Sequence, residues 1–560
     1  MKHSEMPYHR PDVPALLAEL DRLTAEARSA DSGEALLSAF SAMDKAMENY
    51  ETMRELAGTR YTIDTRDPFY SGERDYFDAQ GPAVKNASIS FAKAVLDSPH
   101  RQALADRWGS ILLSRLEVLA QSAGDRVLEL MQKENALGTE YERLYASAQI
   151  PFQGSTFTVA QLASCKLSPD RAVRRSAYEA EGQWFDANRD QFDRIYTGLV
   201  HNLNQQARIL GYNSYVNLSY LRMGRIGYGR TEVESFRRQV AEDVVPLAAE
   251  IQRRRFQRLG VSDPKFYDTG LAFLNGNPKP QGSTPELLDK AVRMYHELSP
   301  ETAEFVDFMA ENNLFDLEAK PGKAPGGYMT ELRAYKAPFI FSNANGTADD
   351  VDTLTHEFGH AFHGYVAMRS QLPGILQEPG AESCEIHSMG MEFLTSPWHH
   401  LFFGPDTERY QLAHAEDALL FLPYGCMVDE FQHIVYENEN LTPDERNQVW
   451  LDLERKYRPW NDFDQLPFYS RGSHWQWKMH LYECPFYYID YCLAQTVALQ
   501  FFAAHLSDPA EAWRRYLALV RQSGSKSYAG LVEAAGFTVP FQAGALAPVV
   551  KTVADWCLKR

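Results

Sequence analysis

DDVDTLTHEFGHAFH, at residues 349–363, is the stretch of this sequence that predicts most about the molecule. Its apolar residues recur every three to four positions, at Val351, Leu354, Phe358 and Phe362, which predicts an α-helix with one buried stripe. Two aspartates open the stretch and suit the cap and first turn of that helix. We therefore expect a helix that begins near residue 349 and is buried along one side.

The motif His-Glu-x-x-His within this helix is a candidate metal site. His356 and His360 are four residues apart, so both imidazoles project from one face of the helix, one turn apart. Two imidazoles in this arrangement can bind a single Zn²⁺, and Glu357 then lies where a water coordinated to zinc would sit. A helix that carries two ordinary histidines is the alternative.

A catalytic zinc takes three protein ligands and leaves a fourth position for water. The third ligand is therefore expected downstream, on a second helix that faces the first. Residues 382–392 read ESCEIHSMGME and offer two candidates by spacing alone, Glu385 and His387. A charged helix face in solvent is the alternative for both.

The composition is typical of a globular protein and disfavours several classes of function. Of the 560 residues, 44% are hydrophobic and 23% are charged, which provides a sizeable core, and the length points to two or three lobes. The formal net charge of −19 disfavours binding to nucleic acid or to an anionic membrane, because both are negatively charged. No run of 18 apolar residues occurs, and the polar N-terminus contains no signal-peptide core.

The six cysteines contain no CxxC pair, which argues against a disulfide scaffold or a structural zinc ribbon. Such sparse cysteines suit a reducing compartment. We expect a soluble, cytoplasmic protein with no nucleic-acid partner and no membrane association. No motif predicts its oligomeric state.

Helical periodicity dominates the chain on both sides of the motif. The first 320 residues are predicted to be mostly helical, with amphipathic runs at residues 13–53, 106–134, 173–184 and 231–260. Residues 326–345 break this pattern with glycine and proline between short aromatic or β-branched runs, which predicts strands near 327–330 and 339–342.

The residues around the motif resemble the thimet oligopeptidase and oligoendopeptidase F family of zinc metallopeptidases, above all its oligoendopeptidase F branch. HEFGH is followed by Glu385, 29 residues after the first histidine. Glu385, Ser388 and Glu392 match the Glu-x-x-Ser-x-x-x-Glu stretch of that family, although Gly390 stands where the thimet branch often has methionine. The resemblance implies that one Zn²⁺ per chain is bound by His356, His360 and Glu385, and that His387 is a structural neighbour.

A second part of the resemblance lies at residues 480–491, which read HLYECPFYYIDY. The oligoendopeptidase F branch has a similar His-Phe-Tyr run before a tyrosine-rich helix. The resemblance implies catalytic roles for His480, Tyr488 and Tyr491, with tyrosine hydroxyls stabilising an oxyanion, and Tyr487 remains a rival to Tyr488. Core packing is the alternative for these aromatic side chains.

The resemblance also implies the architecture. We expect a mostly α, two-lobed helical ellipsoid around a deep substrate channel, with a small β-sheet next to the HExxH helix, as in thermolysin-like or neurolysin-like catalytic cores. Residues 1–200 are expected to form an N-terminal helical lobe. Residues 201–560 are expected to form the catalytic zinc oligopeptidase region, with the lobes interleaved around one cleft.

The implied function is a zinc metalloendopeptidase that hydrolyses internal bonds of short oligopeptides. A water on zinc is the expected nucleophile, and Glu357 is the expected general base. Asp352 and Glu392 could orient an imidazole, and a strand of residues 326–345 could hold an extended peptide by its edge.

Two alternative functions remain. A helical zinc carboxypeptidase or dipeptidase would need a cation for the terminal carboxylate of its substrate, and Arg471 is a possible one. A non-catalytic, zinc-containing peptide-binding protein is the other alternative, but such a site has no use for Glu357 beside an open coordination position.

Overall fold

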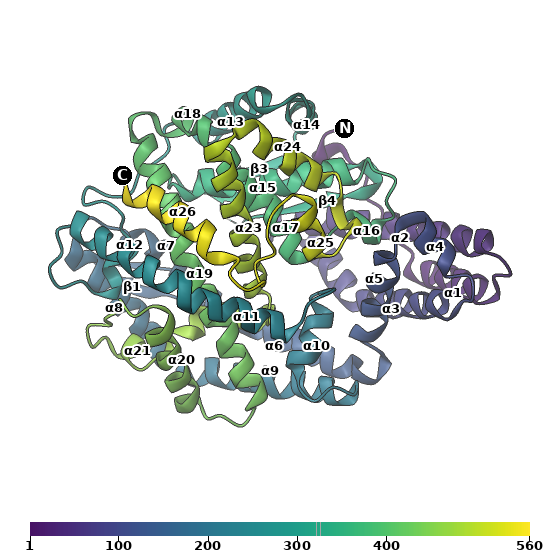
Figure 1. Cartoon of the computed structure of the whole chain (residues 1–560). Coiled ribbons are helices and arrows are strands. Elements are labelled where there is room, and N and C mark those ends of the chain that lie inside the picture. The colour runs from purple at the N-terminus through teal and green to yellow at the C-terminus, as the bar shows by residue number, and fades with distance from the viewer. Residues whose placement is uncertain (321, 325) are drawn as a thin grey trace.

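The computed structural model describes residues 1–320, 322–324 and 326–560, except for the side chain at position 125. Helices form most of the fold, and the prediction of a mostly α architecture with a small sheet beside the HExxH helix is confirmed (Figure 1). Within the described part of the chain, no helix is both long enough and apolar enough to cross a lipid bilayer.

The N-terminal helices form a block at one side of the molecule, drawn in purple and blue in Figure 1. They are α1 (Val13–Ser29), α2 (Gly33–Ile63), α3 (Pro68–Asp97), α4 (Gln102–Trp108) and α5 (Ile111–Ser122). Their apolar stripes, which include Leu20, Leu36, Val95 and Leu112, pack into a hydrophobic core that is separate from the core of the remaining chain.

The next part of the chain is helical apart from one short hairpin. Its elements are α6 (Leu128–Ala146), β1 (Ile150–Phe152), β2 (Ser155–Phe157), α7 (Val159–Lys166), α8 (Arg171–Ala187), α9 (Arg189–Ile209), α10 (Tyr215–Arg222), α11 (Arg230–Gln239), α12 (Val245–Arg258), α13 (Thr284–Leu298) and α14 (Pro300–Glu311). The sequence analysis missed the hairpin. Its two-residue turn has Gln153 and Gly154 at φ of 48° and 80°, which is the left-handed backbone that such tight turns require.

The helical run predicted at residues 231–260 is interrupted. One π-helical turn at Val240–Val244 separates α11 from α12. Pro246 lies at the start of α12. Because proline has no N–H and its ring crowds the preceding turn, it cannot continue an ordinary α-helix through this point.

A three-stranded sheet lies against the helix that carries the metal motif. Its order is β3 (Phe315–Glu318), β5 (Ala337–Ala344) and β4 (Tyr328–Leu332), with β3 parallel and β4 antiparallel to β5. The two predicted strands correspond to β4 and β5. The sequence analysis missed β3, which is short and pairs with a strand more than 20 residues further along the chain.

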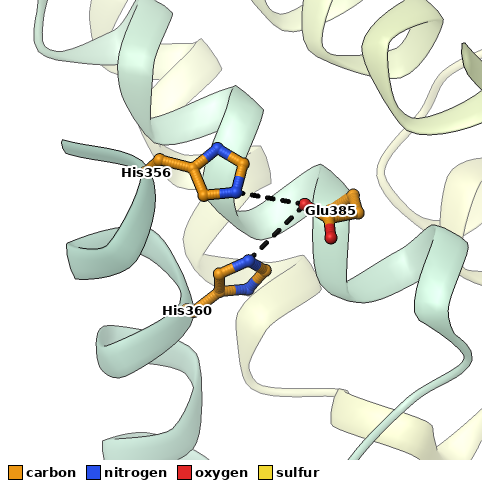
Figure 2. A group of neighbouring side chains, drawn as sticks. All are labelled: His356, His360 and Glu385. Atoms are coloured by element: carbon orange, nitrogen blue, oxygen red, sulfur yellow. Dashed lines mark ion pairs between the residues drawn. The ribbon is translucent and has the colours of Figure 1, made fainter. Parts of the chain in front are cut away.

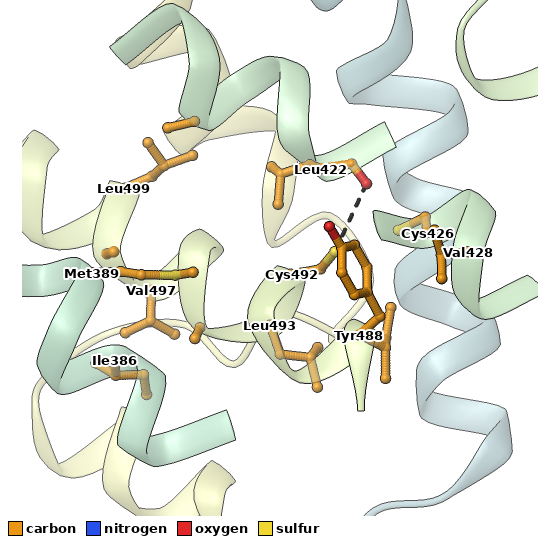
Figure 3. Close-up of a cluster of buried hydrophobic side chains, with 14 of the residues drawn as sticks. Ile386, Met389, Leu422, Cys426, Val428, Tyr488, Cys492, Leu493, Val497 and Leu499 are labelled. Carbon is orange, nitrogen blue, oxygen red and sulfur yellow. Dashed lines mark hydrogen bonds between the residues drawn. The ribbon is translucent and has the colours of Figure 1, made fainter. Parts of the chain in front are cut away.

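Helices then dominate to the end of the chain. They are α15 (Asp349–Ala367), α16 (Gly374–Gln377), α17 (Ala381–Leu394), α18 (His399–Phe403), α19 (Thr407–Glu437), α20 (Pro443–Tyr457), α21 (Pro467–Ser470), α22 (His480–Glu483), α23 (Tyr488–Ser507), α24 (Pro509–Val520), α25 (Tyr528–Ala534) and α26 (Leu546–Leu558). Figure 3 shows buried side chains of α17, α19 and α23, such as Ile386, Leu422 and Leu493, in one cluster. This packing holds α17 in the centre of the larger core.

Residue 200, at which the sequence analysis divides the chain, lies within α9. Leu199 and Val200 are fully buried in the larger hydrophobic core. The division into lobes 1–200 and 201–560 stays a prediction.

The backbones of α15 and α17 cross very closely at Gly359. A Cβ atom at this position would lie 2.4 Å from the carbonyl oxygen of His387 and 2.7 Å from the Cα of Ser388. Real Cβ atoms do not approach backbone atoms so closely, so any larger residue would push the two helices apart.

Gly359→Ala is therefore expected to lower the free energy of unfolding by about 1–3 kcal/mol, the usual cost of overpacking. Urea unfolding followed by circular dichroism measures the change. Gly58→Ala in α2 is the matched control, because no atom lies within 4 Å of the position of its Cβ. The control is expected to be as stable as wild type or up to about 1 kcal/mol more stable, since alanine favours helices. A Gly359→Ala protein as stable as wild type would contradict this close crossing.

Candidate metal centre

Two helices bring three potential metal ligands together. His356 and His360 extend from α15 toward Glu385 on α17 (Figure 2). One carboxylate oxygen of Glu385 lies 3.2 Å from Nε2 of His356 and 3.5 Å from Nε2 of His360. The three ligand atoms all lie within 4.8 Å of one another. Two imidazole nitrogens and one carboxylate oxygen are a donor set that suits zinc and related divalent transition metals.

Hydrogen bonds fix the orientation of Glu385. The hydroxyl of Ser388, one turn along α17, donates to Oε2 at 2.9 Å, and the hydroxyl of Tyr487 donates to Oε1 at 2.6 Å. Although burial opposes ionisation, the charge of His360 and the hydrogen bond with His356 lower the pKa of Glu385 well below its usual range. The carboxylate is therefore kept in the ionised form that a metal ligand needs.

Behind the histidines lies a chain of alternating acid and imidazole groups. Nδ1 of His356 is 2.7 Å from one oxygen of Glu392, and the other oxygen of Glu392 is 2.8 Å from Nε2 of His414. Burial favours the neutral acid, but the hydrogen bonds with His356 and His414 lower the pKa of Glu392. An ionised carboxylate at Nδ1 directs Nε2 of the same ring toward the metal position.

Asp352 contacts a tyrosine and not the imidazole that the sequence suggested. The hydroxyl of Tyr410 donates a hydrogen bond to Asp352, and no described imidazole does so. Burial raises the pKa of Asp352 to about 7. Asp352 and Glu392 are the two acids predicted to orient a histidine ligand. Only Glu392 contacts such a ligand, His356.

Glu357 lies beside the ligands and is almost completely buried. Among the residues described, its Oε2 atom has no hydrogen-bond partner. Burial raises the pKa of Glu357, and the charges of His356 and His360 oppose this shift. A carboxylate with an unsatisfied oxygen and a raised pKa is suited to accept and return a proton.

The three ligands and Glu357 line a cavity of about 1050 Å³. Helices α2, α3 and α5 of the N-terminal block form part of its wall, and β4, α15, α16, α17 and the start of α23 form the rest. The cavity therefore lies between the two hydrophobic cores, with the metal ligands on the side of the larger one.

The structure brings Tyr487 and Tyr491 to this cavity, but not Tyr488. The rings of Tyr487 and Tyr491 lie 4.7 Å apart and both line the cavity. Tyr488 is buried, packs against Tyr424, and accepts a hydrogen bond from Nζ of Lys478 at 3.2 Å. Figure 3 shows its ring beside Cys492 and Leu493 in the hydrophobic cluster.

The physical reason is helical spacing. Tyr487 is the residue directly before α23. Tyr487 and Tyr491 are four residues apart and therefore share one face of the helix, whereas Tyr488 points to the neighbouring side. The sequence contained this signal, but spacings of three and of four residues both suit a helix face.

His480 lies next to the tyrosines. Its ring centroid is 5.0 Å from that of Tyr488, and about 6 Å from those of Tyr487 and Tyr491 (6.1 and 6.0 Å). Burial, assisted by the charge of Lys478, lowers the pKa of His480 to about 4, so the imidazole is neutral at physiological pH. The ring of His480 is thus nearest to that of the buried Tyr488, and His480 is not among the residues that line the cavity.

Two other candidates lie elsewhere. His387 is fully buried and stacks on His363 at 4.1 Å, away from the three ligands. Arg471 forms an ion pair with Asp186 and donates a hydrogen bond to Ser473, and it is not part of the cavity wall. Arg471 is therefore not available to a carboxylate in the cavity.

Comparisons with known proteins agree with these features. The family model described as "Peptidase family M3" matches residues 164–549, and the "Peptidase M3 N-terminal domain" matches residues 3–123. "Oligopeptidase PepF" of Bacillus subtilis (strain 168) is 22% identical over 539 residues, which is 89% of this chain and 76% of the relative. "Oligoendopeptidase F, chromosomal" of Lactococcus lactis subsp. cremoris is 26% identical over 302 residues, which is 52% of this chain and 48% of the relative.

Solved structures extend the similarity to the whole chain. "PZ PEPTIDASE A with inhibitor 2" superposes with a TM-score of 0.95 at 43% sequence identity, covering 100% of this chain and 99% of the other. The oligoendopeptidase-F of Enterococcus faecium shares the fold with a TM-score of 0.64 at 14% identity, covering 98% of each chain.

Glu392→Gln is expected to lower the affinity of the centre for a divalent transition metal by about 10- to 100-fold, because a neutral amide no longer holds Nδ1 of His356. Competition with a coloured chelator measures the affinity. Glu408→Gln, an exposed position at the start of α19, is the matched control and should bind metal as wild type does. Equal metal affinities for wild type and Glu392→Gln would show that Glu392 does not help His356 to bind the metal.

Proposed function

The chain belongs to peptidase family M3, and from this premise we propose that it is a zinc-dependent endopeptidase that hydrolyses internal bonds of short oligopeptides. The observation that carries the proposal is the convergence of His356, His360 and Glu385 beside Glu357 on one cavity wall. Membership of the family accounts for peptidase activity. The metal, the reaction type and the roles below are inferred from the residues of this chain.

The donor set supports zinc as the metal. His356, His360 and Glu385 would hold the ion, and three such ligands leave a coordination position free. When bound, zinc supplies Lewis acidity, which polarises a carbonyl group and lowers the pKa of a water molecule.

Glu357 is the proposed proton carrier. Its unsatisfied carboxylate oxygen accepts the proton of the attacking water, and the resulting acid returns that proton to the amine nitrogen that leaves. The raised pKa of Glu357 supports this cycle, since both protonation states must be accessible.

Tyr491 is the proposed hydrogen-bond donor to the carbonyl oxygen of the substrate as negative charge develops on it. Tyr487 is the proposed second donor, and it would exchange its hydrogen bond with Glu385 for one with the substrate. Their position on the cavity wall supports this role. His480, whose ring centroid lies about 6 Å from those of both tyrosines, is proposed to assist in positioning them. Tyr488 is not retained in the proposal, because it is not among the residues that line the cavity and its ring packs in the interior against Tyr424.

The shape of the site supports short peptides as substrates. A cavity of about 1050 Å³ accommodates a peptide segment but not a folded domain. Strand β4 is an edge of its sheet and borders the cavity, so an extended peptide could pair with its backbone. The free state of all six cysteines supports the proposal that the enzyme acts in the reducing cytoplasm.

The function is tested with an internally quenched peptide of roughly ten residues, blocked at both ends, long enough to span the cavity in extended form. Wild type is expected to cleave an internal bond, and a chelator should abolish cleavage until zinc is restored. Glu357→Gln should lower kcat by about 10²- to 10⁴-fold, because the general base is lost. Mass spectrometry identifies the products.

The other outcomes separate the alternatives. Trimming of one residue or a dipeptide, seen only when the C-terminus is unblocked, would indicate a carboxypeptidase. Stoichiometric zinc and tight peptide binding without any cleavage would indicate a binding protein. Glu408→Gln serves again as the matched control for loss of a carboxylate, because it lies at an exposed position.

The tyrosine assignment has its own test. Tyr487→Phe and Tyr491→Phe are each expected to lower kcat by about 10²-fold, the usual effect of removing an oxyanion donor. Tyr488→Phe, the adjacent tyrosine, should keep kcat close to that of wild type. Steady-state kinetics on the same peptide measure all three variants, and a larger loss for Tyr488→Phe than for the other two would reverse the assignment.

A further inference from the structure

Two of the four arginine and lysine side chains that line the cavity are already neutralised. Arg54 forms an ion pair with Glu55 at 2.7 Å. Arg333 pairs with Glu51 at 2.6 Å and with Asp44 at 3.2 Å. These arginines therefore have little capacity left to bind an anion that enters the cavity.

Arg115 on α5 is different, because it lines the cavity without a counter-ion. Among the residues that the structure describes, none forms a hydrogen bond or an ion pair with its guanidinium group, and its Nε atom is buried without a partner. Burial lowers the pKa of Arg115, but an arginine remains charged at every physiological pH. A half-buried cation without a partner is costly, and binding an anion would remove that cost.

The carboxyl groups nearest to Arg115 do not form an ion pair with it. Glu382 and Glu378 act on it electrostatically, but neither lies within ion-pair distance. Burial raises the pKa of both carboxyls. Lys85 on α3 also lines the cavity, but burial and then the charge of Arg222 lower the pKa of its ammonium group. Arg115 is thus the one arginine of the cavity wall that forms no ion pair with any described residue.

We propose that Arg115 binds a carboxylate group of the peptide substrate, either the free C-terminal carboxylate or an acidic side chain. A guanidinium group presents two parallel N–H donors that match the two oxygens of a carboxylate. This inference rests on the proposed peptidase function, and it assigns the N-terminal helices a part in substrate selection. Arg115 is a specificity-determining residue, since it lies on α5 and not among the residues that carry out hydrolysis.

The test compares four quenched peptides of one length and core sequence. Two differ only in a free or an amidated C-terminus. The other two are both amidated and differ only in a glutamate or a glutamine near the end. Each is assayed with wild type, Arg115→Gln, Arg115→Lys and the control Arg107→Gln, which removes an exposed arginine of α4 in the same block.

For wild type, we expect the kcat/KM of the peptide that carries the carboxylate to be about tenfold higher than that of its neutral counterpart. A charge-assisted hydrogen bond can account for a difference of this size. A preference for the free C-terminus or for glutamate identifies the source of the carboxylate. Arg115→Gln should lose the preference through a higher KM and keep the wild-type rate on neutral peptides. Arg115→Lys should keep part of the preference, and Arg107→Gln should keep all of it.

The inference is overturned if wild type does not distinguish the paired peptides, or if Arg115→Gln retains the preference. Fluorescence anisotropy then measures how tightly the same peptides bind to Glu357→Gln and to the double variant Glu357→Gln with Arg115→Gln. This measurement tests the role of Arg115 without catalysis. Absence of cleavage would overturn the peptidase function, whereas equal binding of acidic and neutral peptides would overturn the role of Arg115. Thermal unfolding of each variant confirms that it is folded.

Discussion

The close crossing of α15 and α17 at Gly359 is the constraint on which the metal centre depends. Glycine allows the backbone of α17 to pass directly over the turn of α15 that lies between His356 and His360. This contact brings the carboxylate of Glu385 to both imidazoles. Packing of α17 against α19 and α23 in the larger core then holds the crossing rigid, so ligand geometry and core packing are coupled.

Buried charge imposes a second constraint, because each ionised group in the interior needs a partner. Around the centre, carboxylates and imidazoles alternate from Glu385 through His356 and Glu392 to His414. The alternation keeps both carboxylates ionised although they are buried, as their lowered pKa values indicate. Glu357, directly beside the ligands, differs from these two carboxylates in having an unsatisfied oxygen and a raised pKa. This contrast separates acids that hold structure from an acid that is suited to exchange protons.

The cavity joins two parts of the chain with separate hydrophobic cores. The larger core carries the candidate ligands and the tyrosines, and the N-terminal helices contribute the facing wall. Chemistry and selection of substrate can therefore reside on different elements. A residue such as Arg115 can change the selection without touching the ligands, since α5 packs within its own core.

The sequence by itself determined the local features of this protein. The 3.6-residue spacing of apolar residues predicted α15, and the four-residue spacing of His356 and His360 placed two imidazoles on one face, because helical geometry follows from local backbone preferences. The resemblance added Glu385 as the third ligand. Only the tertiary structure decided that Tyr487 and not Tyr488 reaches the cavity, that β3 joins the sheet, and that Arg115 lacks a counter-ion. These features depend on contacts between segments that are far apart in the chain, and no spacing within one segment encodes which groups such contacts bury or leave unpaired.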